Sequence, residues 1–207
     1  MKLFLLPRVK KILFSVILLS VLLNLFFLYR YALPKLLKLI PQQYDTVFFG
    51  DAIIEGGDWA SWLNSKIKKS GHPYMTTSTF VGSLNDQVIA YHPKTCYLEG
   101  GVNDALAGIT LERTCSNYRS MIDTLLKHNI TPVIQSTLYV NLPKDSLINR
   151  HIDSLNLYLA SISKERNLRF IDVNSKLSTN KRLRSEYTND GMHLTKEGYD
   201  RWVALIK

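Results

Sequence analysis

The sequence predicts an α/β domain built on a five-stranded parallel sheet and preceded by one transmembrane helix. Five short apolar runs alternate with longer amphipathic stretches after residue 43. Strands separated by helix-length segments are typical of a parallel sheet. Residues 12–29 form a separate apolar run without a charge. With 207 residues, of which 46% are hydrophobic, the chain has room for one globular domain and a short appendage.

The appendage is expected to begin with a short basic cytoplasmic segment, residues 1–11. The uncharged run that follows is just long enough to cross about 30 Å of hydrocarbon as a helix. A cleaved secretory signal is the alternative, but it usually has a shorter apolar region and a small-residue cleavage site. Arg30 stands where that small residue would be needed. We therefore expect a signal-anchor at 12–29 and a juxtamembrane connector at 30–43.

The net charge of +9 is concentrated in the appendage. Residues 1–40 hold seven of the 26 basic residues and none of the 17 acidic ones. The nearly neutral remainder argues against a duplex-binding surface, so no nucleic-acid partner is expected. Four basic residues precede the apolar run and three follow it, which favours a cytoplasmic N-terminus. The domain would then be periplasmic or extracellular.

The predicted domain, residues 44–207, begins with a short apolar run at 45–49 that is typical of a buried strand. A helix is expected over 59–69. The Thr-rich segment 74–80 favours a second strand, because β-branched residues suit a pleated surface. A helix over 84–91 completes this half.

The same alternation continues to the C-terminus. Three further apolar runs predict strands at 95–99, 131–137 and 169–173. Three amphipathic stretches predict helices at 111–128, 146–166 and 195–206. The two cysteines, Cys96 and Cys115, fall on a strand and a helix, where we expect separate thiols rather than a disulfide.

Glycine and polar residues stand beside the predicted strands, at the sheet edge where α/β proteins bind ligands. Gly50-Asp51-Ala52-Ile53 follows the first strand, Gly82 the second and Gly101-Val102-Asn103-Asp104 the third. Before the last helix, Asp190 and His193 are three residues apart, so the carboxylate can hold one ring nitrogen while the other serves as a general base. Each element alone is weak, because glycines mark turns and Asn-Asp pairs cap helices.

The ordered set resembles the GDSL, or SGNH, hydrolase family, from about residue 45 to residue 202. The segment 50–53 matches the first family block, G-D-S-I, at all positions but one. Gly82 falls at the second-block glycine, 101–104 matches G-x-N-D, and 190–193 matches D-G-x-H. Softer features resemble the branch of platelet-activating-factor acetylhydrolase and bacterial glycan esterases. The resemblance implies a three-layer, flavodoxin-like fold.

The resemblance also implies roles for these residues. In the family, the first-block serine attacks an ester carbonyl, His193 would be the base and Asp190 its orienting partner. The oxyanion would be bound by the backbone N–H groups of residues 52 and 82 and by the Asn103 side chain. Gly50, Asp51, Gly101 and Asp104 would support the site. The family requires no metal and no organic cofactor.

Ala52 occupies the position of the nucleophile, so this chain cannot form an acyl-serine intermediate. It is either an engineered Ser→Ala change or a natural loss. The expected function is hydrolysis of small acyl esters, with O-acetyl groups of glycans as the first substrate and lipid acyl esters as the second. The alternatives are a pseudoenzyme that binds acylated glycan or a partner protein, and an O-acetyltransferase working with a membrane acyl-donor protein.

Overall fold

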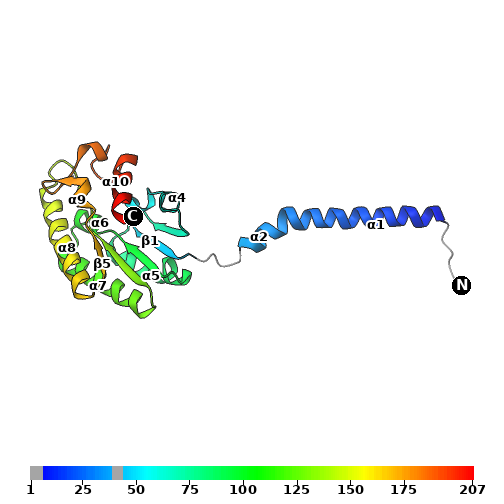
Figure 1. The fold of residues 1–207 in the computed structure, drawn as a ribbon, viewed down its shortest axis with the longest axis horizontal. Helices are drawn as coiled ribbons and strands as arrows, with labels where there is room; N and C mark the ends of the chain where they lie inside the picture. The colour runs from blue at the N-terminus through cyan, green and yellow to red at the C-terminus, as the bar shows by residue number, and fades with distance from the viewer. Residues whose placement is uncertain (1–6, 39–43) are drawn as a thin grey trace. The chain divides into compact units, whose positions relative to one another are not determined.

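The computed structural model describes residues 7–38 and 44–207, and the chain divides into two compact units, residues 1–42 and 43–207. In the first unit, α1 (Pro7–Phe27) continues through a π-helical turn (Leu28–Ala32) into α2 (Leu33–Lys38) (Figure 1). The helical stretch Arg8–Leu36 is long and apolar enough to cross a membrane.

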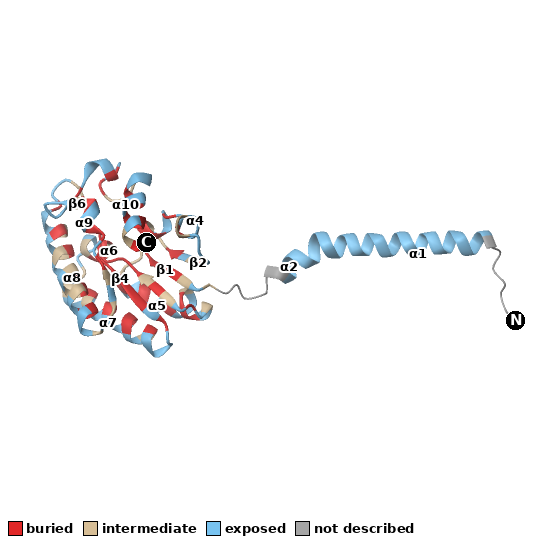
Figure 2. Ribbon diagram, in the orientation of Figure 1, coloured by how far each residue is buried: buried red, intermediate tan, exposed pale blue. Residues whose placement is uncertain are grey.

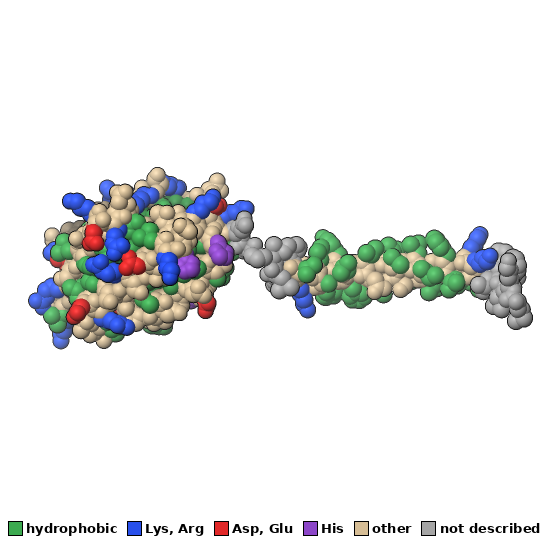
Figure 3. Space-filling view, turned by 90° about the horizontal axis from the view of Figure 1, so that it is seen from below, with side chains coloured by type: hydrophobic (Ala, Val, Ile, Leu, Met, Phe, Trp, Pro, Cys, Tyr) green, Lys and Arg blue, Asp and Glu red, His purple; other side chains and the backbone are tan. Residues whose placement is uncertain are grey.

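The surface of this first unit agrees with such a role. Its described side chains are exposed along the whole helix (Figure 2). Figure 3 shows hydrophobic side chains along its length and basic side chains toward its two ends. The predicted span 12–29 lies within this helix, and the predicted connector is helical up to residue 38. Residues 1–6 of the predicted basic segment and residues 39–43 of the connector lie outside the described residues.

The second unit is a three-layer α/β sandwich, as the sequence predicts. Its sheet contains five parallel strands in the order β2-β1-β3-β4-β5. This flavodoxin-like order changes direction between β1 and β3, where ligands of such folds bind. The strands are β1 (Thr46–Gly50), β2 (Ile67–Gly71), β3 (Thr95–Leu98), β4 (Thr131–Gln135) and β5 (Arg169–Ile171).

Helices cover both faces of the sheet because successive strand side chains point to opposite sides. Phe48 packs with Trp59 of α4 (Trp59–Leu63) and with residues of α10 (Lys196–Ile206) on one face. Val47 and Phe49 pack on the other face, which α5, α7 and α8 cover. These three helices are α5 (Thr77–Gln87), α7 (Leu111–Lys127) and α8 (Ser146–Glu165).

Among the described residues, both cores consist of residues between 47 and 206, and Figure 2 shows the buried residues concentrated along the sheet. The second unit therefore contains everything needed to fold without the appendage. Its remaining elements are short: α3 (Ala52–Glu55), η2 (Ile89–Tyr91), α6 (Val102–Leu106), α9 (Asn174–Leu177), the hairpin of β6 (Ser178–Thr179) and β7 (Arg182–Leu183), and η3 (Ser185–Tyr187). Of these, α3 and α6 directly follow β1 and β3 and form part of the site.

The prediction of a second strand at 74–80 is wrong, because most of that segment belongs to α5. A carboxylate that is distant in the sequence binds the N-terminus of this helix. The backbone N–H of Thr77 donates to Oδ2 of Asp104 at 2.8 Å, and its hydroxyl donates to Oδ1 at 2.5 Å. A carboxylate there satisfies an otherwise unpaired N–H and interacts favourably with the helix dipole. This long-range contact outweighs the β preference of the threonines.

The second strand is instead β2 (Ile67–Gly71), which begins inside the predicted helix 59–69 and extends two residues beyond it. Only the first five residues of that segment are helical, as α4. The strand is at the edge of the sheet, where charged side chains such as Lys68 and Lys69 discourage pairing with other chains. Because of these lysines, the sequence of the segment also resembles the solvent-exposed face of a helix. The predicted helix 84–91 corresponds to the end of α5 followed by η2.

Candidate active site

Asp190 and His193 form a hydrogen-bonded pair at the edge of a cavity. Nδ1 of His193 lies 2.6 Å from Oδ2 of Asp190. Oδ1 of Asp190 accepts the backbone N–H groups of Met192 at 2.9 Å and His193 at 2.8 Å. Burial raises the pKa of Asp190, but these hydrogen bonds outweigh it and leave the pKa below its ordinary value. Asp190 is therefore an anion that orients the ring, and Nε2 is the nitrogen left for proton transfer.

The loop that carries this pair is fixed by Gly191 and Asn141. Gly191 has φ +86°, and a Cβ there would lie 2.4 Å from the Asn141 carbonyl oxygen. The backbone N–H of Asn141 donates to the Gly191 carbonyl at 2.7 Å. Gly191 N–H donates to the Thr188 hydroxyl at 2.9 Å. A side chain at 191 would therefore disturb the loop in two ways, through backbone strain and through a clash.

Position 52 begins α3, directly after the end of β1. The side chain of Asp51 caps this short helix by accepting the Ile53 N–H at 2.9 Å. The N–H of residue 52 belongs to the first turn, where helical N–H groups have no partner within the helix. The same turn is braced by the end of β2, since the His72 N–H donates to the Gly50 carbonyl at 3.0 Å.

Asn103 lies on α6, which follows β3. Gly101 caps this helix at φ +110°, and a Cβ there would lie 2.6 Å from the Leu155 side chain. Nδ2 of Asn103 donates one hydrogen to the Met75 carbonyl at 3.0 Å, which leaves its second N–H for a ligand. Asp104 is fully buried and binds Thr77 and Thr114, so it holds α5 and α7 beside the site.

One cavity of about 440 Å³ brings these groups together. Asp51, Ala52, Asn103 and His193 line it. The rest of its wall is apolar: Ile53, Pro73, Tyr74, Val102, Leu106 and Met192. The arrangement offers a base, its orienting carboxylate and an amide donor around position 52, whose side chain is a methyl group. These are the parts of an acyl-transfer site without its hydroxyl.

The structure does not bring Gly82 to this cavity, which corrects the prediction. Gly82 is an exposed residue in the middle of α5, where a helix uses each N–H for the carbonyl four residues earlier. Tyr74 lines the cavity instead, with φ +63°, a conformation unusual for residues other than Gly, Asn or Asp. The error follows from the misassigned strand 74–80. Sequence reasoning missed Tyr74 because the turn position carries no glycine.

Two buried carboxyl groups lie behind position 52. Asp51 and Glu99 are each 1% exposed, and among residues 44–207 no Lys or Arg forms an ion pair with either. Burial raises the pKa of Asp51 to about 6, although the hydrogen bond from the Ile53 N–H and the charge of His193 both lower it. Burial and the charge of Asp51 raise the pKa of Glu99 well above its ordinary value. The pair therefore holds a proton up to a higher pH than two solvated carboxyl groups would.

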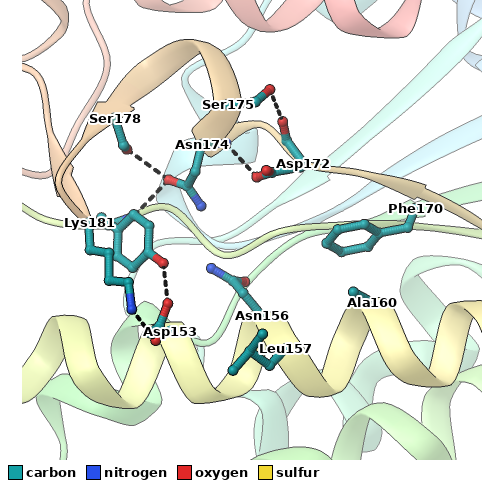
Figure 4. Close-up of a pocket in the computed structure, with 11 residues that line it drawn as sticks. Asp153, Asn156, Leu157, Ala160, Phe170, Asp172, Asn174, Ser175, Ser178 and Lys181 are labelled. Atoms are coloured by element: carbon teal, nitrogen blue, oxygen red, sulfur yellow. Dashed lines mark hydrogen bonds and ion pairs between the residues drawn. The ribbon is translucent and has the colours of Figure 1, made fainter.

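A second cavity, of about 340 Å³, shares no residue with the first (Figure 4). It lies between α8 and the segment 170–178. Its polar groups largely bind one another, since Asp153 accepts from Tyr139 at 2.7 Å and pairs with Lys181 at 2.9 Å. In the described part of the chain, no group of three or more His, Cys, Asp or Glu side chains could hold a metal ion. Cys96 and Cys115 are both free thiols, as expected.

Known proteins resemble this chain in sequence and in fold. The model of the GDSL-like Lipase/Acylhydrolase family matches residues 48–201. A GDSL-like lipase from Bacteroides thetaiotaomicron gives a TM-score of 0.73 at 26% identity, covering 86% of this chain and 94% of its own. A catalytic mutant of an acetylxylan esterase from Geobacillus stearothermophilus gives 0.68 at 16% identity, with coverages of 81% and 94%. This second likeness is one of fold.

Similar curated proteins include the N-acylneuraminate cytidylyltransferases of Streptococcus agalactiae serotypes V and III. They are 26% and 29% identical to this chain over 126 residues. The matched region is 61% of this chain but only 30% of each relative. The chain therefore matches about a third of the length of these relatives.

Proposed function

Because this chain belongs to the GDSL-like lipase/acylhydrolase family of carboxylic ester hydrolases, we propose that its cavity is an acyl-ester site that lacks only the nucleophile. The observation that carries the proposal is the convergence of Asn103, His193 and position 52 on one cavity, with His193 held by Asp190 at 2.6 Å. With serine at 52, these groups make up a Ser-His-Asp hydrolase. With alanine, the site binds esters without forming an acyl-enzyme.

The proposed mechanism assigns one task to each group. A serine oxygen at 52 forms the bond to the ester carbonyl carbon, and its proton passes to Nε2 of His193. The tetrahedral oxyanion accepts hydrogen bonds from the backbone N–H of residue 52 and from Nδ2 of Asn103. The backbone N–H of Tyr74 serves as the third oxyanion donor, in place of the Gly82 N–H expected from the sequence. His193 then protonates the leaving alcohol, and a water molecule attacks the acyl-enzyme by the same route.

Ala52 removes the first step. In a serine protease, loss of the nucleophile costs about 10⁶ in turnover, and what remains comes from the oxyanion donors and substrate binding. The chain as it stands is therefore mainly a binder, whose remaining ester turnover is only about 10³–10⁴-fold above unassisted hydrolysis. Ala52 also favours a second candidate function, a natural pseudoenzyme that recognises an acylated glycan or a partner protein.

An acylated sugar is the proposed alcohol side of the substrate. The support is the similarity to proteins named for N-acylneuraminate, an acylated sugar acid. The matched third of those proteins gives no reason to assign cytidylyl transfer to this chain. Transfer of the acyl group to a glycan, rather than to water, needs the same catalytic groups and differs only in the acceptor.

We also propose that Arg8–Leu36 anchors the protein in a membrane with the N-terminus in the cytoplasm. The support is the length and apolarity of the helix and the excess of basic residues before it. A reporter enzyme fused after Lys207 that is active only outside the cytoplasm should be active in cells expressing the full chain. An inactive reporter on a stably expressed fusion would contradict this orientation.

The catalytic proposal is tested by comparing residues 43–207 with Ala52 and with Ala52→Ser on 4-nitrophenyl butyrate. The serine form should turn over at least 10³-fold faster, and adding His193→Ala should abolish the gain. Leu126→Trp in the serine form is the matched control, because Leu126 is exposed and lies outside the cavity. A folded serine form that is as inactive as the alanine form contradicts the enzyme proposal and favours the pseudoenzyme.

A further inference from the structure

We infer that the wall beside position 52 holds a medium-length acyl chain of about six to ten carbons, rather than the acetyl group expected from the sequence. This inference rests on the proposed function, since it assigns the acyl side of the same ester site. It follows from the size of the cavity, the chemistry of its wall and the exposure of its rim.

The cavity is much larger than an acetyl group needs. Its volume is about 440 Å³, within the range of small-molecule sites. An apolar cavity of about 150 Å³ already accommodates benzene, with its six carbons. An acetyl ester would therefore leave most of the wall in contact with water, whereas about eight acyl carbons would cover it and leave room for the ester group.

The side chains of the wall suit methylene groups better than a sugar ring. Its polar side chains, Asp51, Asn103 and His193, all belong to the catalytic set. The remaining side chains are Ile53, Pro73, Tyr74, Val102, Leu106 and Met192. A buried sugar hydroxyl without a hydrogen-bond partner is costly, and beyond these three side chains the only polar side-chain group of the wall is the hydroxyl of Tyr74, which is 90% exposed. The sugar therefore lies outside the apolar part and the acyl chain inside it.

The rim of the cavity is apolar and exposed. Tyr74 is 90% exposed and Leu106 is 42% exposed, and they come from the β2–α5 connection and from α6. Both side chains line the same cavity as the buried apolar residues Ile53 and Val102. An apolar surface that continues from a rim into a cavity marks a ligand site, whereas a single exposed leucine does not.

The test uses residues 43–207 with Ala52→Ser and 4-nitrophenyl esters of two to twelve acyl carbons below their micelle concentrations. Burying half of each methylene raises kcat/KM by about twofold per carbon. The octanoyl ester should therefore be about 60-fold better than the acetyl ester. The profile should level off or fall by twelve carbons, because the cavity is then full.

Leu106→Trp adds bulk at the rim on an already exposed position, so it should fold. It should lower the ratio of octanoyl to acetyl kcat/KM by about tenfold. Leu126→Trp makes the same change at a position that is 39% exposed on α7 and outside the cavity. This control should leave the ratio unchanged.

Isothermal titration of the Ala52 domain with sodium octanoate and sodium acetate gives a readout that needs no turnover. Octanoate should bind and acetate should not, and Leu106→Trp should weaken octanoate binding. A serine form that prefers the acetyl ester overturns the inference and leaves the proposed function intact. A folded serine form that hydrolyses no ester refutes the proposed function, and octanoate titration then decides the inference: binding supports an acyl cavity, and no binding overturns it.

Discussion

Replacing Glu99 by glutamine tests the buried carboxyl pair behind the candidate active site. Glu99 and Asp51 are almost fully buried, and burial raises the pKa of both groups, that of Asp51 to about 6. A carboxyl with a raised pKa in the folded state holds its proton more firmly there than in the unfolded chain. Its contribution to stability is therefore complete at low pH and is lost as the pH rises through the folded pKa.

The size of the effect follows from these pKa values. Each proton held only by the folded state lowers the free energy of unfolding by about 1.4 kcal/mol per pH unit. For Asp51, the rise from 3.8 to about 6 corresponds to a total loss of about 3 kcal/mol. The Asp51 loss is complete only about one pH unit above this pKa, and the slope that remains at higher pH belongs to Glu99, whose pKa burial raises well above its ordinary value. An amide at 99 cannot ionise, so Glu99→Gln should remove that slope.

Urea unfolding of residues 43–207, followed by tryptophan fluorescence from pH 5 to pH 8, measures the effect. Above pH 7 the free energy of unfolding of the unchanged domain should continue to fall as the pH rises, by up to about 1.4 kcal/mol per pH unit while Glu99 keeps its proton in the folded state, and that of Glu99→Gln should stay nearly level. Glu186→Gln is the control: hydrogen bonds from its own backbone N–H and from Arg184 lower the pKa of Glu186. Its curve should run parallel to that of the unchanged domain above pH 6. A parallel curve for Glu99→Gln would refute a protonated Glu99.

Three further predictions concern single residues of the site. In the Ala52→Ser domain, Asn103→Ala should lower kcat by about 10²–10³; a loss below tenfold in steady-state assays would exclude Asn103 as an oxyanion donor. Tyr74→Gly should raise the free energy of unfolding by about 1 kcal/mol, because the left-handed backbone at φ +63° is strained for tyrosine, and a destabilised variant in urea would contradict this. Gly191→Ala should destabilise the domain by about 2–3 kcal/mol through strain and the clash with Asn141, whereas Gly108→Ala, also at positive φ but with nothing within 4 Å of its Cβ, should cost only about 1 kcal/mol.

The parts of the fold that were predictable from the sequence depend on local patterns. The apolar run of β1 is buried on both faces, and that of β3 is buried on one face and half-buried on the other, so both stand out as strands. The Asp190–His193 pair is three residues apart and is held within its own loop, so its spacing indicates it once the other family blocks are found in the same order. The region around Ala52 and Asn103 also follows from strand ends that meet at one sheet edge.

The errors fall where distant contacts decide the structure. Thr77 begins a helix because Asp104, 27 residues away, binds its N–H and hydroxyl, and no local pattern contains that information. Edge strand β2 gains its conformation by pairing with β1, although its lysines resemble a helix surface. Because the second strand was misplaced, the prediction assigned an oxyanion donor to Gly82. The turn that lies at the cavity instead carries Tyr74, in a backbone conformation that glycine usually adopts.

The most direct test of the central claim is covalent labelling of the domain with a fluorophosphonate, which reacts with activated serine hydroxyls. Intact-mass and peptide mass spectrometry would be applied to residues 43–207 with Ala52, with Ala52→Ser, and with Ala52→Ser combined with His193→Ala. The account predicts a single adduct at residue 52 of the first serine form and none on the other two proteins. A folded Ala52→Ser domain that remains unlabelled, or is labelled at another serine, would contradict the claim that only the nucleophile is missing.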